Sequence, residues 1–277
     1  MTTQTPDAAA GSADSPVDTA ALLDLARRAA SAAGAELMRR YGHIEGLRTK
    51  STATDPVSAA DLAAEAVLVE MITTERPDDG LLAEEGSSRP SVSGLRWVVD
   101  PLDGTVNYLY GLGNFSVSVA VEDGDGALVG VVLDPGTGRE YSAVRGEGAF
   151  CDGERLQVVD PIPMGQALLG TGFGYDPARR ALQGQVIAAL LPTVRDIRRT
   201  GSAALDMCWV AAGKLDAFYE VGLQPWDAAA GGLIAQEAGA VFTALVQLPG
   251  GPTRFLTAGP SLHHELSSAL AELPVVT

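Results

Sequence analysis

The pattern of apolar positions predicts helices near the beginning of the chain. Between residues 18 and 41, apolar side chains recur three or four positions apart, as on one face of a helix, at Leu22, Leu25, Ala29, Ala33, Leu37 and Tyr41. Gly42 follows this run and is typical of a helix end. A second helix is expected from Ser58, a good N-terminal cap, with Asp61 three residues later in its first turn.

An alternating pattern replaces the helical one further along the chain. Apolar residues alternate with small or polar ones, as in a half-buried strand, at Phe115, Val117, Val119 and Val121. More strands are expected at residues 127–133, 141–144 and 149–151, separated by turn residues at 123–126 and 152–153. The chain up to about residue 155 therefore looks like helices packed on an antiparallel meander.

The second half of the chain alternates strands with helices. Strands are expected at residues 167–170, 196–198 and 215–220 and near Ala240 and Phe255, and helices at residues 177–191, 202–212 and 226–238 and from about 262. Such alternation predicts a sheet with helices on its faces. We therefore divide the chain into a disordered N-terminal tail (1–17), an α+β half (18–155) and an α/β half (156–277).

Length and composition limit the class of protein. The 277 residues, 46% of them hydrophobic, suit one large α/β unit or two halves that share a face. No apolar run reaches the roughly 18–20 residues of a membrane span, and the beginning lacks the basic stretch of a secretory signal. Two cysteines, Cys151 and Cys208, are too few for a disulfide framework and favour buried thiols in a reducing compartment. We expect a cytoplasmic protein without membrane association.

The charge of the chain restricts its ligands. The formal net charge is −16, which argues against direct nucleic-acid binding because such binding needs a basic surface. The same charge would repel an anionic substrate unless bound cations reversed the field locally.

The stretch from Trp97 to Tyr108 carries the strongest chemical signal. Residues 97–99 read as the end of a buried strand, and Pro101 is expected to stop that strand because it lacks a backbone donor. Asp100 and Asp103 would then leave the strand end together, followed by Gly104 and Thr105 with outward N–H groups. Paired carboxylates beside free N–H groups suit a hard cation and a phosphate, although an ordinary capping turn has the same composition.

Three further acids follow the same logic, and each also has a purely structural interpretation. Asp61 is either a helix-dipole carboxylate or a base beside a metal-bound water. Glu84 ends a short apolar stretch and is the better pocket candidate of the pair 84–85. Asp227 lies where a first-turn or capping residue of a helix belongs.

Four motifs in this order resemble the inositol monophosphatase family of magnesium-dependent, lithium-sensitive phosphatases. They are residues 55–61 (DPVSAAD), 84–85 (EE), 100–108 (DPLDGTVNY) and 226–231 (WDAAAG). The resemblance covers roughly residues 22–240, and residues 170–175 and 198–204 further resemble bacterial members that act on myo-inositol 1-phosphate. The departures from the family pattern are mild and remove no ligand; they are Ser58, Ala83, Leu102 and Tyr108.

The resemblance implies a layered α-β-α-β-α sandwich of the magnesium-dependent sugar phosphatase type, usually a homodimer. It implies two or three Mg²⁺ per subunit, with Mn²⁺ as a substitute, held by Glu84, Asp100, the carbonyl of Leu102, Asp103 and Asp227. Asp100 would bridge two of these ions. Glu84 would also belong to the catalytic set, in which Asp61 and Thr105 would orient and deprotonate a metal-bound water. Phosphate would bind the N–H groups of Gly104 and Thr105, and substrate hydroxyls would contact Ser202, Ala203, Glu220 and Asp227.

Elementary chemistry agrees with these implications. Five acids converging in one pocket could not all stay ionised without a cation. Oxygen ligands without a histidine or cysteine cluster favour Mg²⁺ or Mn²⁺ over Zn²⁺. We therefore predict a phosphomonoesterase that hydrolyses myo-inositol 1-phosphate, a small-molecule phosphate monoester, by direct attack of water. The alternatives are a histidinol-phosphate, other sugar or nucleotide phosphatase of this family, or a regulatory partner-binding role on this fold.

Overall fold

The computed structural model describes residues 17–43, 48–49, 56–246, 251–273 and 276. The predicted tail, apart from the exposed Val17, and Asp55 of the first motif lie outside the described residues. The helices are α1 (Thr19–Arg40), α2 (Ala59–Glu75), α3 (Thr105–Leu109), α4 (Pro177–Leu190), α5 (Ala203–Ala211), α6 (Pro225–Glu237) and α7 (Pro260–Ala271), with a 3₁₀ turn at Met164–Gln166.

The strands form two sheets and a small ribbon. The ribbon pairs β1 (Arg48–Thr49) with β2 (Pro56–Val57). The first sheet contains β3 (Gly80–Ala83), β4 (Ser88–Arg89), β5 (Arg96–Asp103), β6 (Ser116–Asp123), β7 (Gly126–Asp134), β8 (Arg139–Val144), β9 (Gly148–Cys151) and β10 (Glu154–Arg155). The second contains β11 (Leu168–Thr171), β12 (Asp196–Arg198), β13 (Ala217–Val221), β14 (Val241–Val246) and β15 (Thr253–Ala258).

The first two helices begin and end as their sequences predict. Asp18 caps α1 by accepting a hydrogen bond from the N–H of Ala21 at 3.0 Å. Gly42, just beyond the helix, has a φ of +83°, a left-handed value that glycine adopts without steric cost. At the start of α2 the side chains of Ser58 and Asp61 form a capping box.

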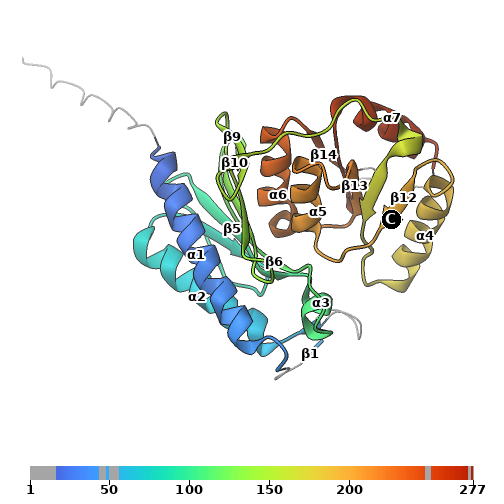
Figure 1. Cartoon of the computed structure of the whole chain (residues 1–277). Coiled ribbons are helices and arrows are strands. Elements are labelled where there is room, and N and C mark those ends of the chain that lie inside the picture. The colour runs from blue at the N-terminus through green and yellow to red at the C-terminus, as the bar shows by residue number, and fades with distance from the viewer. Residues whose placement is uncertain (1–16, 44–47, 50–55, 247–250, 274–275, 277) are drawn as a thin grey trace, which may run out of the picture.

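The first sheet has the strand order β10-β9-β8-β7-β6-β5-β3-β4. From β5 to β10 it is an antiparallel meander, as predicted, and β3 pairs with β5 in parallel. Helices α1 and α2 cover one face of this sheet (Figure 1). The buried apolar residues between them include Leu22, Leu37, Leu68, Ile72, Trp97, Val99, Val117 and Val119.

The prediction that Pro101 stops its strand is wrong. β5 runs from Arg96 to Asp103, and its pairing with β6 resumes at Asp103 opposite Ser116 after a register shift. A bulge between Asp100 and Asp103 places Pro101 where no ladder hydrogen bond is required. The strand therefore continues through the proline, and the bulge changes the direction of the two flanking carboxylates.

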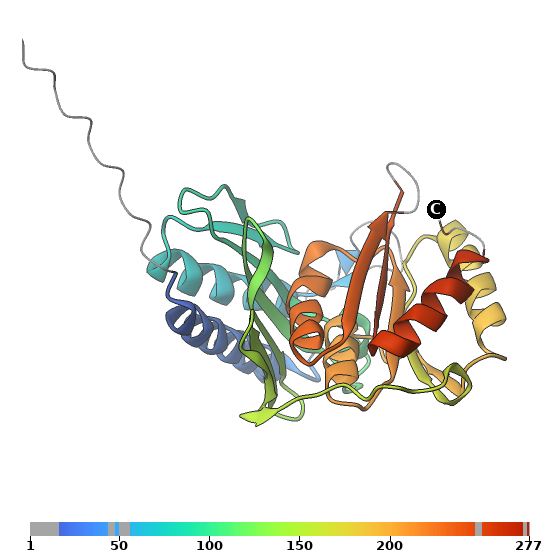
Figure 2. The same ribbon diagram turned by 90° about the horizontal axis from the view of Figure 1, so that it is seen from above.

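The second sheet has the order β12-β11-β13-β15-β14, with a parallel half and an antiparallel half. Helices α5 and α6 lie between the two sheets, and α4 and α7 cover the outer face of the second (Figures 1 and 2). The layers therefore follow the order α-β-α-β-α, which confirms the predicted fold class. The helices α1, α2, α4, α5, α6 and α7 each bury apolar residues against a sheet, as layered architectures require.

A buried aspartate anchors the beginning of β5. The carboxylate of Asp79 accepts hydrogen bonds from the indole of Trp97 at 2.9 Å, from Arg76 at 2.8 Å and from Ser93 at 2.6 Å. Burial raises the pKa of Asp79, but the hydrogen bonds from Arg76, Ser93 and Trp97 outweigh it and leave the pKa below its usual value. This network holds the strand whose far end carries Asp100.

The structure bears on the predictions about the cysteines and about membrane spans. Both cysteines are free thiols; Cys208 is buried, whereas Cys151 is only half-buried. Among the helices of the described ranges, none combines the length and the apolar character that a bilayer crossing requires.

Candidate active site

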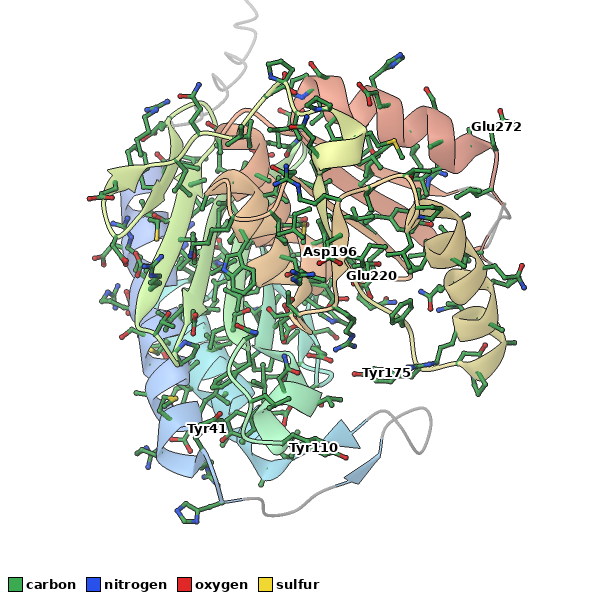
Figure 3. The ribbon with its side chains drawn as sticks, turned by 45° about the vertical axis from the view of Figure 1, so that its right-hand side comes forward. Tyr41, Tyr110, Tyr175, Asp196, Glu220 and Glu272 are labelled. Atoms are coloured by element: carbon green, nitrogen blue, oxygen red, sulfur yellow. The ribbon has the colours of Figure 1, made fainter. Side chains whose placement is uncertain are left out.

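A pocket of about 570 Å³ lies where the end of β5 meets the beginnings of α5 and α6. Its wall includes ten of the eleven predicted site residues: Glu84, Asp100, Leu102, Asp103, Gly104, Thr105, Ser202, Ala203, Glu220 and Asp227. The eleventh, Asp61, lies behind Thr105 and is fully buried. In Figure 3, Glu220, on the second sheet, lies near the middle of the molecule, and Tyr175 is nearer the open edge. The fold thus brings together residues that are up to 166 positions apart, from Asp61 to Asp227.

Four acids share the inner end of this pocket. Asp100 is 1% exposed, and its Oδ1 accepts a hydrogen bond from the N–H of Leu102 at 2.9 Å. Burial, together with the charges of nearby acids, raises the pKa of Asp100 well above its usual value. Those neighbours are Glu84, Asp103 and Asp227. The carboxylates therefore destabilise one another around the buried Asp100.

Asp103 connects the two halves of the molecule. Its Oδ2 accepts hydrogen bonds from the hydroxyl of Ser202 at 2.6 Å and from the N–H of Ala204 at 2.8 Å. Burial raises the pKa of Asp103 to about 6 although these hydrogen bonds oppose the change. Ser202 also caps α5 by accepting from the N–H of Leu205 at 3.2 Å. The hydroxyl proton of Ser202 is therefore directed at Asp103.

Asp227 reaches the pocket from the first turn of α6. It is the third residue of the helix, and its Oδ2 accepts a hydrogen bond from the N–H of Gln224 at 2.7 Å. The capping residue is thus Gln224, and Asp227 completes the capping box from inside the helix. Burial and the charges of Asp103 and Glu84 raise the pKa of Asp227 well above its usual value.

Asp61 and Thr105 form a buried pair behind the acids. Oδ2 of Asp61 accepts hydrogen bonds from the N–H of Ser58 at 2.9 Å and from its hydroxyl at 2.5 Å. Oδ1 of Asp61 lies 3.2 Å from the hydroxyl oxygen of Thr105, which is also 3.2 Å from the carbonyl oxygen of Leu102. Burial raises the pKa of Asp61, and the hydrogen bonds from Ser58 oppose this change. Asp61 therefore caps α2 through one oxygen and faces Thr105 with the other.

The loop that carries Glu84 is held by a residue that the sequence analysis missed. Glu65 is 5% exposed, and its carboxylate accepts hydrogen bonds from the N–H groups of Glu85 at 2.7 Å and Ser87 at 3.1 Å. Glu65 lies one helical turn after Asp61, so both carboxylates leave α2 on the same side. In the sequence, the four-residue spacing of these two acids on a mostly apolar helix could have pointed to Glu65.

The backbone at Gly104 requires a glycine. Gly104 precedes α3 with a φ of +99°, and a Cβ there would lie 3.2 Å from the carbonyl oxygen of Gly201 in the second half. Nearby, the side-chain amide of Asn107 donates to the carbonyl oxygen of Thr200 at 2.7 Å. The turn after Asp103 is thus packed directly against the segment that leads into α5.

The second half adds two acids with strongly altered pKa values. Burial raises the pKa of Glu220 to about 8, and Arg199 opposes this change. Burial likewise raises the pKa of Asp206 to about 8, although its Oδ1 accepts a hydrogen bond from the hydroxyl of Thr200 at 2.5 Å. Glu220 was predicted as a site residue, whereas Asp206, Arg199 and Arg179 of the pocket wall were not. Asp206 is the single charge of the otherwise apolar helix α5 and Arg199 lies in the 198–204 stretch, so both had a signal in the sequence, whereas Arg179 had none.

The acid cluster fits a hard divalent cation by its donor chemistry. No three His, Cys, Asp or Glu side chains within the described ranges are already arranged as a complete ligand set. Without a cation the carboxylates repel one another, and Asp103 and Asp227 accept hydrogen bonds from the protein. All the donors are oxygens, which Mg²⁺ prefers, and the burial of Asp100 among charged neighbours favours a compensating cation.

Comparisons with known proteins give a consistent result. The sequence model of the inositol monophosphatase family matches residues 18–272. The inositol-1-monophosphatase of Mycobacterium leprae is 44% identical over 241 residues, which cover 81% of this chain and 81% of that protein. A protein of Haemophilus influenzae named Nus factor SuhB is 41% identical over 221 residues, covering 79% of this chain and 83% of that protein.

Solved structures have the same fold. The extragenic suppressor protein SuhB of Bartonella henselae is 33% identical, covers 91% of this chain and 99% of its own, and superposes with a TM-score of 0.83. The staphylococcal protein SaIMPase-II, solved with inositol monophosphate bound, is 28% identical, covers 90% of this chain and 92% of its own, and has a TM-score of 0.74.

Proposed function

The chain belongs to the inositol monophosphatase family, and from this premise we propose that it is a Mg²⁺-dependent phosphatase that hydrolyses myo-inositol 1-phosphate to inositol and phosphate. The relative from Mycobacterium leprae carries the name inositol-1-monophosphatase, and the staphylococcal neighbour was solved with inositol monophosphate. The name supports an inositol phosphate as the substrate. The staphylococcal protein was also solved with 2'AMP bound, so its structures support phosphate monoesters in general.

The observation that carries the proposal is the cluster of acids around the buried Asp100, beside the Asp61–Thr105 pair. The cation would be held by the carboxylates and the carbonyl described above, namely Glu84, Asp100, Leu102, Asp103 and Asp227. When bound, Mg²⁺ would neutralise the phosphate charge and lower the pKa of a water in the site. The remaining task of the protein is to position the water and accept its proton.

Thr105 and Asp61 can perform that task together. A hydroxyl carries one hydrogen, so Thr105 donates either to Oδ1 of Asp61 or to the carbonyl of Leu102 at any time. When it donates to Asp61, its lone pairs can accept a hydrogen bond from the attacking water. The proton then passes from water to the Thr105 oxygen while the Thr105 proton moves to Asp61 Oδ1. Burial, which raises the pKa of Asp61, favours that protonated product.

A panel of phosphate esters tests the proposed function. Purified protein with Mg²⁺ is expected to release phosphate from myo-inositol 1-phosphate faster than from histidinol phosphate, fructose phosphates or nucleotide monophosphates. Chelation of the metal should stop the reaction, and Li⁺ should inhibit it. A preference for histidinol phosphate or a nucleotide would show that this ester, and not myo-inositol 1-phosphate, is the substrate. A protein that hydrolyses none of the esters would contradict the proposal.

A second candidate function is a regulatory binding role, which the 41% identity to the protein named Nus factor SuhB favours. Such a role does not need acids that destabilise one another, whereas this chain keeps all of them in its pocket. An Asp100→Asn chain that fulfils the protein's role in cells would favour binding over catalysis.

Glu65 is expected to set the affinity for Mg²⁺ through the Glu84 loop. In Glu65→Gln, the neutral amide offers one acceptor oxygen, so the two N–H groups of the loop lose their common carboxylate. We expect the Mg²⁺ concentration at half-maximal activity to rise about 10-fold or more. This is the usual effect of removing a residue that orients a metal ligand. The Mg²⁺-induced rise in Tm should shift to the same higher concentrations.

Glu70→Gln is the matched control, because Glu70 is an exposed acid of the same helix. It should leave both the Mg²⁺ dependence and the Tm unchanged. If Glu65→Gln behaved like Glu70→Gln in both measurements, the loop would not depend on Glu65.

A further inference from the structure

Arg179 carries a buried donor that the protein itself does not use. It lies in the first turn of α4, and its side chain lines the pocket. Its Nε is buried and has no hydrogen-bond partner in the described part of the chain, and no described acid forms an ion pair with Arg179. Buried donors in native proteins nearly always have a partner, so an orphaned one in a pocket wall indicates a ligand.

The position of this guanidinium is built into the fold. A Cβ at Gly222 would lie 3.1 Å from Nη1 of Arg179, and a Cβ at Gly174 would lie 3.4 Å from its Cδ. The backbone N–H of Arg179 is itself fixed by a 2.8 Å hydrogen bond to Asp176. The side chain therefore packs between two stretches of backbone that carry no Cβ, which restricts its conformations.

The acceptor that complements Arg179 is Glu220. Glu220 lies near the end of β13, and Gly222, which contacts Arg179, follows the last residue of that strand. The Glu220 carboxylate packs so closely on Gly172 that a Cβ there would collide with it. The segment 172–174 thus has the Glu220 acceptor at one end and the Arg179 donor at the other, and both line the pocket.

We propose that Arg179 is a specificity-determining residue, whose guanidinium donates a hydrogen bond to one ring hydroxyl of the substrate while Glu220 accepts a hydrogen bond from another hydroxyl of the same ring. This inference rests on the proposed phosphatase function and names the substrate class of the same site. A hydroxyl both donates and accepts, so the hydroxyls of one ring can satisfy both a donor and an acceptor of the pocket wall. A second phosphate carries no hydrogen to donate to Glu220. The site therefore selects a polyhydroxylated monophosphate.

The test compares two adjacent arginines on two substrates. Arg179→Gln is measured with myo-inositol 1-phosphate and with 4-nitrophenyl phosphate, which has no hydroxyls. We expect kcat/KM for the inositol ester to fall about 10- to 100-fold, the usual effect of losing a hydrogen bond from a charged group. The aryl ester should lose less than about 3-fold, because the groups around its phosphate are unchanged. Arg179→Lys should not restore the selectivity, because the lysine ammonium lacks the planar fork of donors of a guanidinium.

Arg180→Gln is the matched control. Arg180 is exposed, and its guanidinium lies over the ring of Phe173 at 6.0 Å and donates to the carbonyl of Gly174 at 3.2 Å. Because Arg180 contacts the segment 173–174 but not the pocket, the variant should change kcat/KM for both esters by the same factor and leave the selectivity between them unchanged. If Arg179→Gln does not fold, Arg179→Met is measured in its place. This variant keeps the aliphatic packing and should show the same losses on the two esters.

Calorimetric binding of myo-inositol itself separates this inference from the proposed function. We expect Arg179→Gln to weaken that binding by the same factor as kcat/KM. Equal losses on both esters, or unchanged inositol binding, would overturn the role of Arg179 and leave the phosphatase standing. A wild-type chain that binds inositol through Arg179 but hydrolyses no ester would overturn the proposed function alone.

Discussion

Asp100→Asn is expected to lower kcat for myo-inositol 1-phosphate on the order of 10³-fold. The substitution removes the negative charge at the centre of the site that would hold the cation. The fold should survive. The amide oxygen of asparagine can accept the N–H of Leu102 that Asp100 Oδ1 accepts at 2.9 Å. The charges of Glu84, Asp103 and Asp227 disfavour a carboxylate at this position, so a neutral amide relieves repulsion.

The Tm distinguishes loss of metal binding from loss of structure. Without Mg²⁺ the Asp100→Asn chain should melt at the wild-type temperature or above it. Mg²⁺ should raise the Tm of the wild type, since it binds the folded state, and should leave that of the variant unchanged. Asp125→Asn, in the exposed turn between β6 and β7, is the control and should behave as wild type. Near-normal turnover by folded Asp100→Asn in Mg²⁺ would refute the metal assignment.

Asp61→Asn is expected to lower kcat on the order of 10²-fold or more, the typical contribution of a general base. The amide oxygen can keep the hydrogen bond from the N–H of Ser58, so the cap of α2 persists and the Tm should change little. The amide nitrogen then faces Thr105 and donates to it. Thr105 would turn its proton to the carbonyl of Leu102, and no acceptor would remain for the proton of water.

Substitutions at Thr105 provide the control for this prediction. Thr105→Ser keeps the hydroxyl and should retain most of the activity, whereas Thr105→Val should match Asp61→Asn. Because the two residues act in one proton transfer, the double variant should lose little more than either single variant. An unchanged kcat in Asp61→Asn would leave Asp61 with its capping role only.

Most of the fold could be predicted because local patterns and tertiary packing agree. The alternation at Val117, Val119 and Val121 predicts a strand with one face toward apolar helices, and the structure places these residues under α1 and α2. The caps at Ser58 and Ser202 mark the beginnings of α2 and α5, because a side-chain oxygen there satisfies an otherwise free N–H. Such signals involve residues that are neighbours in the sequence, so they can be read without knowing the fold.

Pro101 shows the limit of that reasoning. A proline normally ends a strand because it cannot donate to the ladder. In β5 a bulge absorbs the missing donor, and pairing resumes at Asp103. Whether a bulge forms depends on the neighbouring strand, which supplies Ser116 as the next partner. Local propensity alone therefore predicted the wrong end for this strand.

The sequence by itself was enough to identify the acids, their oxygen chemistry and the succession of strands and helices, because these depend on residue type and short spacing. The layered arrangement followed only from the family resemblance. Only the tertiary structure showed that Asp103 is bound by Ser202, that Glu65 holds the Glu84 loop and that Arg179 has an unused donor in the pocket. Each of these facts depends on contact and burial between distant segments. The free energy of a buried charge or donor is decided by the groups around it, and packing alone selects those groups.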